Sequence, residues 1–439
     1  MKSTTGVWPP PLSTQPLVRP SEGVSLGDRA VRVSPDLLLP FFDQLKADQS
    51  ADLALNIHLP FCPSRCLSCD RVAVVQHGDE EVDRYIVHLE QELMMIAAAV
   101  GGHRPLARVH FGGGSPNHLS DLTLATLFSH ISRHFSLSST TRISMELNPR
   151  RTSRAQLNFL KGLGVSQLKL EVRDVDAKVQ QEIGRIHSLE LLEDVISIAH
   201  GVRFESLGMD YLVGLPGQTV ESCEQSMEAM VSLAPDWLVC LPFHRRESVF
   251  PHQIAVDAAH LPSLADRLAM FNQVQMGFDD AGYHWVGLNV FAKPEHELSV
   301  AQRTGNLGLN VLGYVPEKAL AVLGVGLGAL SEVPGAVYQN EVNLSNWHAL
   351  IDAGLLSAHA AVVPDESEIL RRKVLRGLVC QQTLHATSLT PAQENEWLLP
   401  LVDQGFAKRE EQGEYLLTEL GRSVLPHVWS DSSPAFRSL

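Results

Sequence analysis

Residues 56–71, NIHLPFCPSRCLSCDR, decide which fold and which chemistry the sequence predicts. An apolar run leads into a loop that carries Cys62, Cys66 and Cys69 at the spacing C-x3-C-x2-C. Three cysteines this close together indicate one soft metal centre, because thiolates are preferred ligands of zinc and of iron-sulfur clusters. A [4Fe-4S] cluster held by three cysteines leaves one iron open to a further ligand.

A structural zinc is the main alternative for this loop, and buried core cysteines without a metal are another. Zinc needs four ligands in a closed site, so it would recruit His58, Asp70 or His77 as the fourth. The other three cysteines are scattered through separate segments, which argues against a disulfide framework. The spacing alone leaves the occupant open.

The cysteine loop follows the first of six apolar runs that we interpret as buried strands. The runs cover residues 53–58, 107–111, 141–147, 166–172, 207–212 and 236–241. Five amphipathic segments that we interpret as helices separate them, at residues 79–100, 120–135, 153–164, 188–200 and 219–233. In the first, apolar side chains keep helical spacing behind an acidic start. This alternation predicts an α/β fold with a parallel sheet that closes wholly or partly into a barrel or stays open.

The pattern divides the chain into three parts. Residues 1–50 are rich in proline and serine and predict a partly irregular N-terminal extension, and residues 51–365 contain the strand-helix units. Residues 366–439 predict a helical piece followed by a hairpin and a helix, which resembles a small, mostly helical winged-helix-like domain.

Composition narrows the class of protein. The 439 residues are 44% hydrophobic and 19% charged, which is enough apolar material for a large core. The formal net charge of -15 argues against a nucleic-acid partner, because no basic run is long enough to overcome the unfavourable field. No apolar stretch predicts a membrane span and the N-terminus lacks a secretory pattern, so we expect a cytoplasmic location.

Chemically active residues recur where the predicted strands end, which is where parallel α/β folds place their sites. After the cysteine loop come FGGGSPN at residues 111–117, Glu146, Arg173 with Asp174, Asp210, and His244, each following a successive strand. In the second of these, the three glycines Gly112, Gly113 and Gly114 would let backbone approach a ligand and expose N–H donors to it. A simple turn is the alternative for that triplet.

The pairing of IHLPFC and its cysteine spacing with FGGGSP one strand later resembles the radical S-adenosylmethionine (SAM) superfamily. That resemblance implies a partial (β/α)6 TIM-like barrel. It also implies a [4Fe-4S] cluster whose open iron binds the amino and carboxylate groups of SAM. One electron from the cluster then cleaves SAM to methionine and a 5'-deoxyadenosyl radical.

Across roughly residues 50–430 the chain is similar to the oxygen-independent coproporphyrinogen III oxidase family. Segments in the same order carry this likeness: ISMELNPRR, MDYLVGLPGQTVES, YHWVGLNVFAKPEHELSVAQRTGNL and LGVGLGALS. The resemblance implies that Cys62, Cys66 and Cys69 hold the cluster. It implies SAM contacts at the following positions: Asn56, Ser68, Gly113, Gly114, Ser115, Glu146, Arg173, Arg185, Asp210, His244 and Leu330. Arg185 falls within a segment that we interpret as helical.

The family reaction removes a hydrogen atom, CO2 and one electron from each of two propionates of coproporphyrinogen III, giving protoporphyrinogen IX for heme biosynthesis. The resemblance therefore implies a tetrapyrrole substrate, one or two SAM molecules and a low-potential electron donor. We expect a monomer.

The chain departs from the family pattern near the cofactors. Asn56 replaces a tyrosine, Ser68 an aromatic residue and Arg71 a cysteine, while Val311 and Leu312 replace a Phe-Gln pair near the pocket for a second SAM. These changes keep two alternatives open. One is a paralogue acting on another tetrapyrrole or small molecule by methyl transfer or heme modification, and the other is a non-catalytic heme-binding or heme-delivery protein.

Overall fold

A computed structural model describes residues 31–32, 35–75, 78–386 and 389–422, and a single 13-stranded sheet forms its centre. All six predicted strands are present and pair with their chain neighbours in parallel. They are β2 (Asp52–Leu59), β5 (Arg108–Gly113), β6 (Arg142–Leu147), β7 (Gln167–Arg173), β8 (Ser206–Val213) and β9 (Trp237–Pro242).

The sheet extends beyond these six strands on both sides. A seventh parallel strand, β14 (Leu320–Val325), pairs with β2 although it comes more than 250 residues later in the chain. Antiparallel strands continue from it: β15 (Leu330–Val333), β16 (Ala336–Asn340), β17 (Ala358–Val362) and β1 (Val31–Arg32). Beyond β9 lie β11 (Val290–Ala292) and β10 (His284–Gly287). Among the described strands, β1 and β10 are the two free ends, so the barrel is partial.

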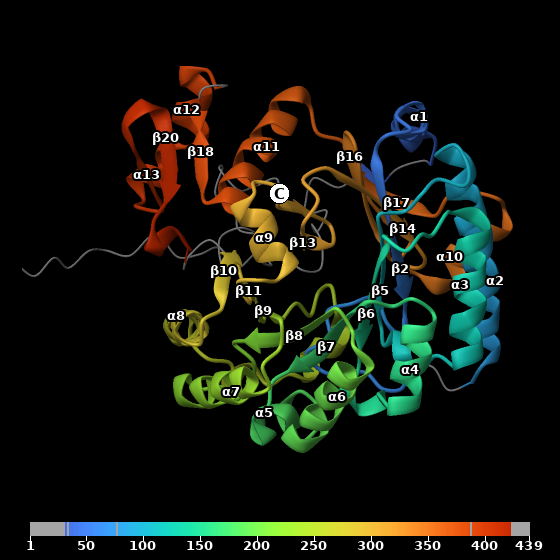
Figure 1. Cartoon of the computed structure of the whole chain (residues 1–439), viewed down its shortest axis with the longest axis horizontal. Coiled ribbons are helices and arrows are strands. Elements are labelled where there is room, and N and C mark those ends of the chain that lie inside the picture. The colour runs from blue at the N-terminus through green and yellow to red at the C-terminus, as the bar shows by residue number, and fades with distance from the viewer. Residues whose placement is uncertain (1–30, 33–34, 76–77, 387–388, 423–439) are drawn as a thin grey trace, which may run out of the picture.

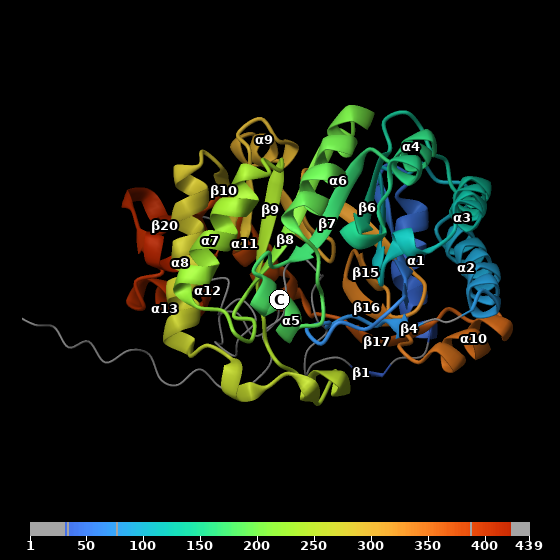
Figure 2. The same cartoon turned by 90° about the horizontal axis from the view of Figure 1, so that it is seen from below.

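Helices cover the outside of the curved sheet, as Figures 1 and 2 show. Five of them were expected: α2 (Glu80–Ala99), α3 (Asp121–His134), α4 (Arg154–Gly162), α6 (Leu189–Val202) and α7 (Val220–Ser232). Ser120, Ser153, Ser188 and Thr219 cap the last four by accepting a backbone N–H from the first turn. Two further helices, α5 (Ala177–Glu182) and α8 (Leu264–Asp280), lie along the same outer layer.

The main core lies between the helices and the outer face of the sheet. On β2, Leu53, Leu55, Ile57 and Leu59 are fully buried against the helices, in strict alternation. The intervening side chains, such as Asn56 and His58, therefore point into the barrel, where polar groups can gather.

The region after β9 builds the remaining elements. It contains α9 (Glu297–Arg303), the hairpin of β12 (Gly308–Asn310) and β13 (Gly313–Val315), and α10 (Leu344–Asp352). Near the N-terminus lie α1 (Leu39–Ala47) and the short strands β3 (Phe61–Cys62) and β4 (Val74–Val75). Most of the predicted irregular extension over residues 1–50 falls outside the described residues.

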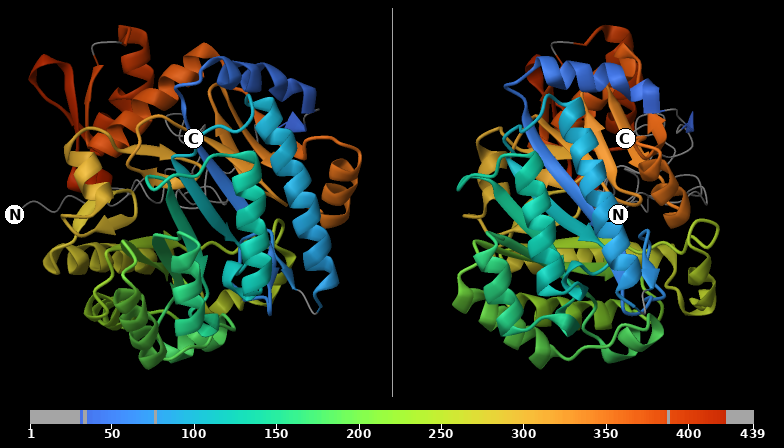
Figure 3. Two further views of the ribbon diagram at one scale, coloured as in Figure 1. Left: turned by 45° about the vertical axis from the view of Figure 1, so that its right-hand side comes forward. Right: turned by 90° about the vertical axis from the view of Figure 1, so that its right-hand side faces the viewer.

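The C-terminal part contains α11 (Glu366–Gln381), α12 (Pro391–Trp397), α13 (Leu399–Asp403) and a three-stranded sheet. That sheet has the order β18 (Thr383–His385), β20 (Glu414–Leu417) and β19 (Ala407–Arg409). One apolar cluster joins Leu375 and Leu378 of α11 to Val286 and Leu288 beside β10, so this part packs onto one end of the large sheet, as Figure 3 shows. None of the helices built from described residues has the length and apolarity of a membrane span.

Candidate active site

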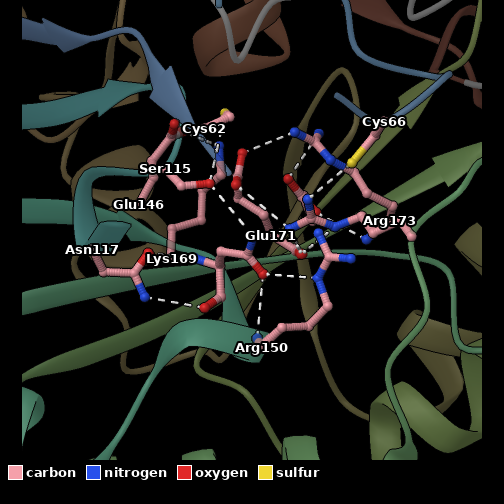
Figure 4. A network of polar contacts seen from close by, with 12 residues as sticks. Cys62, Cys66, Ser115, Asn117, Glu146, Arg150, Lys169, Glu171 and Arg173 are labelled. Carbon is pink, nitrogen blue, oxygen red and sulfur yellow. Dashed lines mark hydrogen bonds and ion pairs between the residues drawn. The ribbon is translucent and has the colours of Figure 1, made fainter. Parts of the chain in front are cut away.

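The three cysteines of the 56–71 stretch lie on the loop after β2 and line one cavity at the carboxyl ends of the strands. The same cavity is lined by other predicted site residues, namely Ser68, Gly113, Gly114, Ser115, Arg173 and Arg185. Figure 4 shows part of this group, with Cys66 beside a dense set of charged side chains. The sheet therefore brings together segments as far apart in the chain as Cys62 and Arg185.

The cysteine loop is held by a second loop that follows β9. The backbone carbonyl of Cys69 accepts hydrogen bonds from Gln253 Nε2 at 2.9 Å and from His252 Nε2 at 2.7 Å. Asp70 forms an ion pair with Arg246, at 3.4 Å between Oδ2 and Nη2. These contacts give the loop a defined shape before any metal binds.

The thiols themselves lie in a poorly solvated place. Burial raises the pKa of Cys62 to about 12 and the pKa of Cys69 to about 11. Because a metal binds the thiolate, loading this site must release protons.

Neither described candidate for a fourth zinc ligand faces the thiols. His58 Nε2 lies 2.7 Å from the carbonyl oxygen of Val72, and Asp70 is paired with Arg246. His77 lies outside the described residues. Within the described chain, no three His, Cys, Asp or Glu side chains converge round a single ion. Three thiols spread round one cavity, with no fourth donor among the described residues, fit a cluster in which each cysteine binds a different iron.

The glycine loop after β5 serves close packing as well as the cavity. A Cβ on Gly114 would lie 2.6 Å from backbone atoms of Pro60 and Phe61, and Gly113 has φ +109° with the His58 ring 2.7 Å from its would-be Cβ. The predicted exposure of N–H donors is wrong for the end of this loop. The amides of Gly114 and Ser115 donate to the carbonyls of Leu59 and Phe61, at 2.7 and 2.9 Å.

Arg173 ends β7 in a left-handed conformation, with φ +73°, where the register with β8 shifts. Asp210 on β8 holds it twice: its Oδ1 accepts the backbone N–H of Arg173 at 3.1 Å, and its Oδ2 lies 3.0 Å from Nη1. Glu171 Oε1 accepts from Nη2 at 2.9 Å. Strained backbone held by this many contacts is typical of a site that needs one side-chain direction.

Arg185 lies in the loop between α5 and α6, so the expectation that it is helical is wrong. The chain turns at Gly184, whose φ is +66°, and this directs the buried guanidinium toward the cluster loop. Arg185 Nη1 lies 3.5 Å from Cys66 Sγ, and Nη2 donates to the carbonyl of Glu171 at 2.6 Å.

Glu146 on β6 is bound by two cations of the chain. The two terminal nitrogens of the Arg71 guanidinium, Nη1 and Nη2, contact the Glu146 carboxylate, and Lys169 Nζ lies 2.7 Å from Glu146 Oε1. Although burial alone would raise it, these two positive charges hold the pKa of Glu146 well below its usual range. In the sequence, Arg71 is recognisable only as a departure from the family pattern, and its contact with Glu146 was not predicted.

Other predicted contacts lie away from the cluster cavity. Asn56 Nδ2 donates to the carbonyl of Leu330 at 3.0 Å, so these two residues meet each other inside the barrel. His244 follows β9 and Asp210 is fully buried beneath Arg173, and neither lines the cavity. Direct contacts of Asn56, Glu146, Asp210, His244 and Leu330 with SAM stay predictions.

Charge is the feature that sequence reasoning missed. Arg65, Arg71, Arg150, Arg173 and Arg185 line the cluster cavity, whereas Glu171 is the only acidic residue among the described lining residues. This concentration is unexpected in a chain of net charge -15. The ELNPRR run after the third predicted strand carries Arg150 and could have suggested it. A cavity of this kind favours anionic ligands and thiolates.

Comparisons with known proteins agree with this geometry. Residues 56–230 match the family model of the radical SAM superfamily. The chain is 27% identical over 386 residues to the oxygen-independent coproporphyrinogen III oxidase of Salmonella typhimurium, covering 86% of this chain and 84% of that protein. It is 28% identical over 387 residues to the protein of that name from Escherichia coli (strain K12). The solved structure of the Escherichia coli coproporphyrinogen III oxidase, described as a radical SAM enzyme, matches with a TM-score of 0.83 and 26% identity, covering 88% of this chain and 91% of that one.

Proposed function

The chain belongs to the radical SAM superfamily, and on this premise we propose that it converts coproporphyrinogen III to protoporphyrinogen IX without oxygen. Each of two propionates would lose a hydrogen atom, CO2 and one electron to become a vinyl group. The observation that carries the proposal is the shared cavity of the three cysteines, the glycine loop, Arg173 and Arg185, in a chain that follows its coproporphyrinogen-oxidising relatives over most of its length.

The superfamily implies a [4Fe-4S] cluster and SAM, which together supply a 5'-deoxyadenosyl radical when both are bound. In this chain, Cys62, Cys66 and Cys69 would hold the cluster. Arg185 contacts both Cys66 and the Glu171 carbonyl, so its planar guanidinium is fixed in a position from which it can pair with a carboxylate.

The cavity arginines also suit the substrate class. Arg150 follows β6 on the short turn Pro149–Arg151, and its Nε lies 3.3 Å from Asn148 Oδ1. Together with Arg65 it adds positive charge beyond what the neighbouring carboxylates neutralise, and a polycarboxylate tetrapyrrole would complement that charge.

An anaerobic assay tests the proposal. Protein reconstituted with iron and sulfide is mixed with coproporphyrinogen III, SAM and a strong reductant, and mass spectrometry identifies the products. The expected product has lost two CO2 and carries two vinyl groups. SAM cleavage without any decarboxylated product would reject the reaction but keep the superfamily chemistry. A Cys66→Ala variant is the control for cluster-independent turnover.

A paralogue with a different tetrapyrrole reaction is a second candidate, and one observation favours it. Arg71 forms an ion pair with Glu146, and the Asn56 side chain donates to the carbonyl of Leu330. Side chains that were expected to contact cofactors therefore bind other groups of the chain. A methylated or ring-opened tetrapyrrole in the same assay would select this candidate, and complete conversion of both propionates would eliminate it.

Several narrower statements stay predictions alongside this proposal. They are a low-potential electron donor, one or two SAM molecules, a monomeric state and a cytoplasmic location. The division into a radical SAM part at 51–365 and a C-terminal part at 366–439 also stays a proposal, and limited proteolysis near residue 365 would test it.

A further inference from the structure

Arg71 connects the cysteine loop to the inside of the barrel. It follows Cys69 by two residues, and its side chain crosses the cavity to reach three neighbouring strands. Its Nη1 donates to the carbonyl of Gly113 on β5 at 3.3 Å, contacts Glu146 on β6, and lies 3.3 Å from Glu171 Oε1 on β7. Arg71 is therefore part of both the cluster loop and the barrel wall.

The ion pair of Arg71 with Glu146 separates two spaces. Arg71 lines the cluster cavity, whereas Glu146 and Lys169 line a second cavity of about 110 Å³ deeper in the barrel. Only 9% of the Arg71 side chain and 5% of the Glu146 side chain are exposed. The pair thus fills the boundary between the two cavities with matched charges.

Every carboxylate at this boundary already has a cation from the chain. Glu146 pairs with Arg71 and Lys169, Glu171 with Arg71 and Arg173, and Asp210 with Arg173. These are three negative charges against three positive charges before the other cavity arginines are counted.

A ligand with positive charge needs acceptors that no other cation holds. SAM carries two such charges, on its sulfonium and its ammonium groups. A first molecule would use its amino and carboxylate groups at the open iron of a cluster held by the three cysteines, whereas a second molecule must find acceptors on the protein. At this boundary Arg71 engages the Glu146 carboxylate and the Gly113 carbonyl, while Asn56 engages the carbonyl of Leu330.

We propose that Arg71 takes the place of a second cationic ligand at Glu146, so that the site admits one SAM molecule and excludes another. The inference rests on the proposed function in one respect, namely that the cluster-loaded protein binds SAM. An intramolecular cation has no translational entropy to lose, so it competes with a free ligand at any accessible concentration.

The test counts SAM molecules bound per cluster. Cluster-loaded, unreduced protein is dialysed anaerobically to equilibrium against labelled SAM, and iron content and the cluster spectrum verify loading. The wild type should reach a plateau of about one SAM per cluster, and Arg71→Met should approach about two, because Glu146 Oε2 loses the Arg71 cation while Lys169 stays on Oε1. Arg71→Lys keeps a cation within reach of Glu146 and should return to about one.

A matched control separates this effect from a general loss of cavity charge. Arg65 lines the same cavity but bonds the carbonyl of Ala73, and it has no ion pair among the described residues. Arg65→Met should therefore keep the wild-type stoichiometry. In the double variant Arg71→Met/Glu146→Gln the negative charge that would attract a cationic ligand is also gone, so binding should fall back to about one SAM per cluster.

Two results would overturn the inference while leaving the proposed function intact. One is a wild-type plateau of about two SAM molecules per cluster. This measurement needs no variant, so it decides the question even if Arg71→Met fails to load its cluster. The other is a cluster-loaded Arg71→Met that still binds one SAM. If the loaded wild type binds no SAM, the proposed function itself fails and the inference falls with it.

Discussion

Two sides of the barrel interior, close together in space, differ in how they follow the expected pattern. The cluster side consists of Cys62, Cys66, Cys69, Arg173 and Arg185, which line one cavity. On the inner side, Glu146, Asn56 and Leu330 are engaged by other groups of the chain instead. The difference shows that predicted site residues surround a cavity on the cluster side, whereas on the inner side they bind groups of the chain itself.

The substitution with the largest expected effect disrupts the cluster side alone. Cys66→Ala removes one of three ligands, so we expect loss of the cluster and at least a ~100-fold fall in SAM cleavage, because the cofactor supplies the radical chemistry. Iron content, electron paramagnetic resonance and 5'-deoxyadenosine release measure it. Cys223→Ala is the control, since Cys223 is buried beside Tyr211 and far from the loop. Equal cluster content in both variants would contradict the assigned ligand set.

The substitution with the next largest expected effect changes the inner side and leaves the cysteines in place. Lys169→Met removes one of the two cations of Glu146. Because Arg71 still pairs with the carboxylate, the cost in unfolding free energy should lie below the value of about 3–5 kcal/mol for a buried charge left unpaired. Lys178→Met, on the exposed face of α5, is the matched control.

The same variant has a pH signature. A carboxylate whose folded pKa is depressed stabilises the protein above its unfolded pKa of about 4.3, and this contribution is lost as the pH falls through the folded pKa. With Lys169 gone, Arg71 is the main cation that still opposes the effect of burial and the pKa of Glu146 is lowered less, so the loss should begin at higher pH than in the wild type. Melting temperatures measured from pH 3 to pH 8 would show this shift, and superimposable acid limbs would refute it.

A smaller effect concerns the contact between the glycine loop and the cysteine loop. A Cβ at Gly114 would meet backbone atoms of Pro60 and Phe61 at 2.6 Å, so Gly114→Ala should cost about 1–3 kcal/mol and lower cluster occupancy. Gly162→Ala is the control, because nothing lies within 4 Å of its would-be Cβ at the end of α4. Chemical denaturation and iron analysis of both variants test the prediction, and equal stability of the two would count against it.

The smallest effect concerns the support of the cysteine loop from outside the barrel. Asp70→Asn removes the charge that pairs with Arg246 but keeps an oxygen that can accept from the guanidinium, so we expect a cost of about 1 kcal/mol although the pair is mostly buried. The cluster should still form but release iron to a chelator a few times faster. An unchanged release rate would show that the hydrogen bonds from Gln253 and His252 hold the loop by themselves.

Much of the fold could be predicted because local patterns report it. All six strands lie within two residues of the apolar runs, and the five expected helices begin at Ser or Thr caps or behind acidic residues. By contrast, β14 beside β2 and the antiparallel strands at both edges were not predicted, because their pairing joins segments that are distant in sequence.

The sequence by itself determined where the cysteine and glycine loops fall relative to the strands, because spacing and hydrophobic periodicity are local properties of the chain. It also determined that three thiols stand without a fourth on one loop. Only the tertiary structure decided which charges meet. Arg71, Glu146 and Lys169 come from different strands and loops, and their pairing depends on the directions in which side chains project into a shared, poorly solvated space.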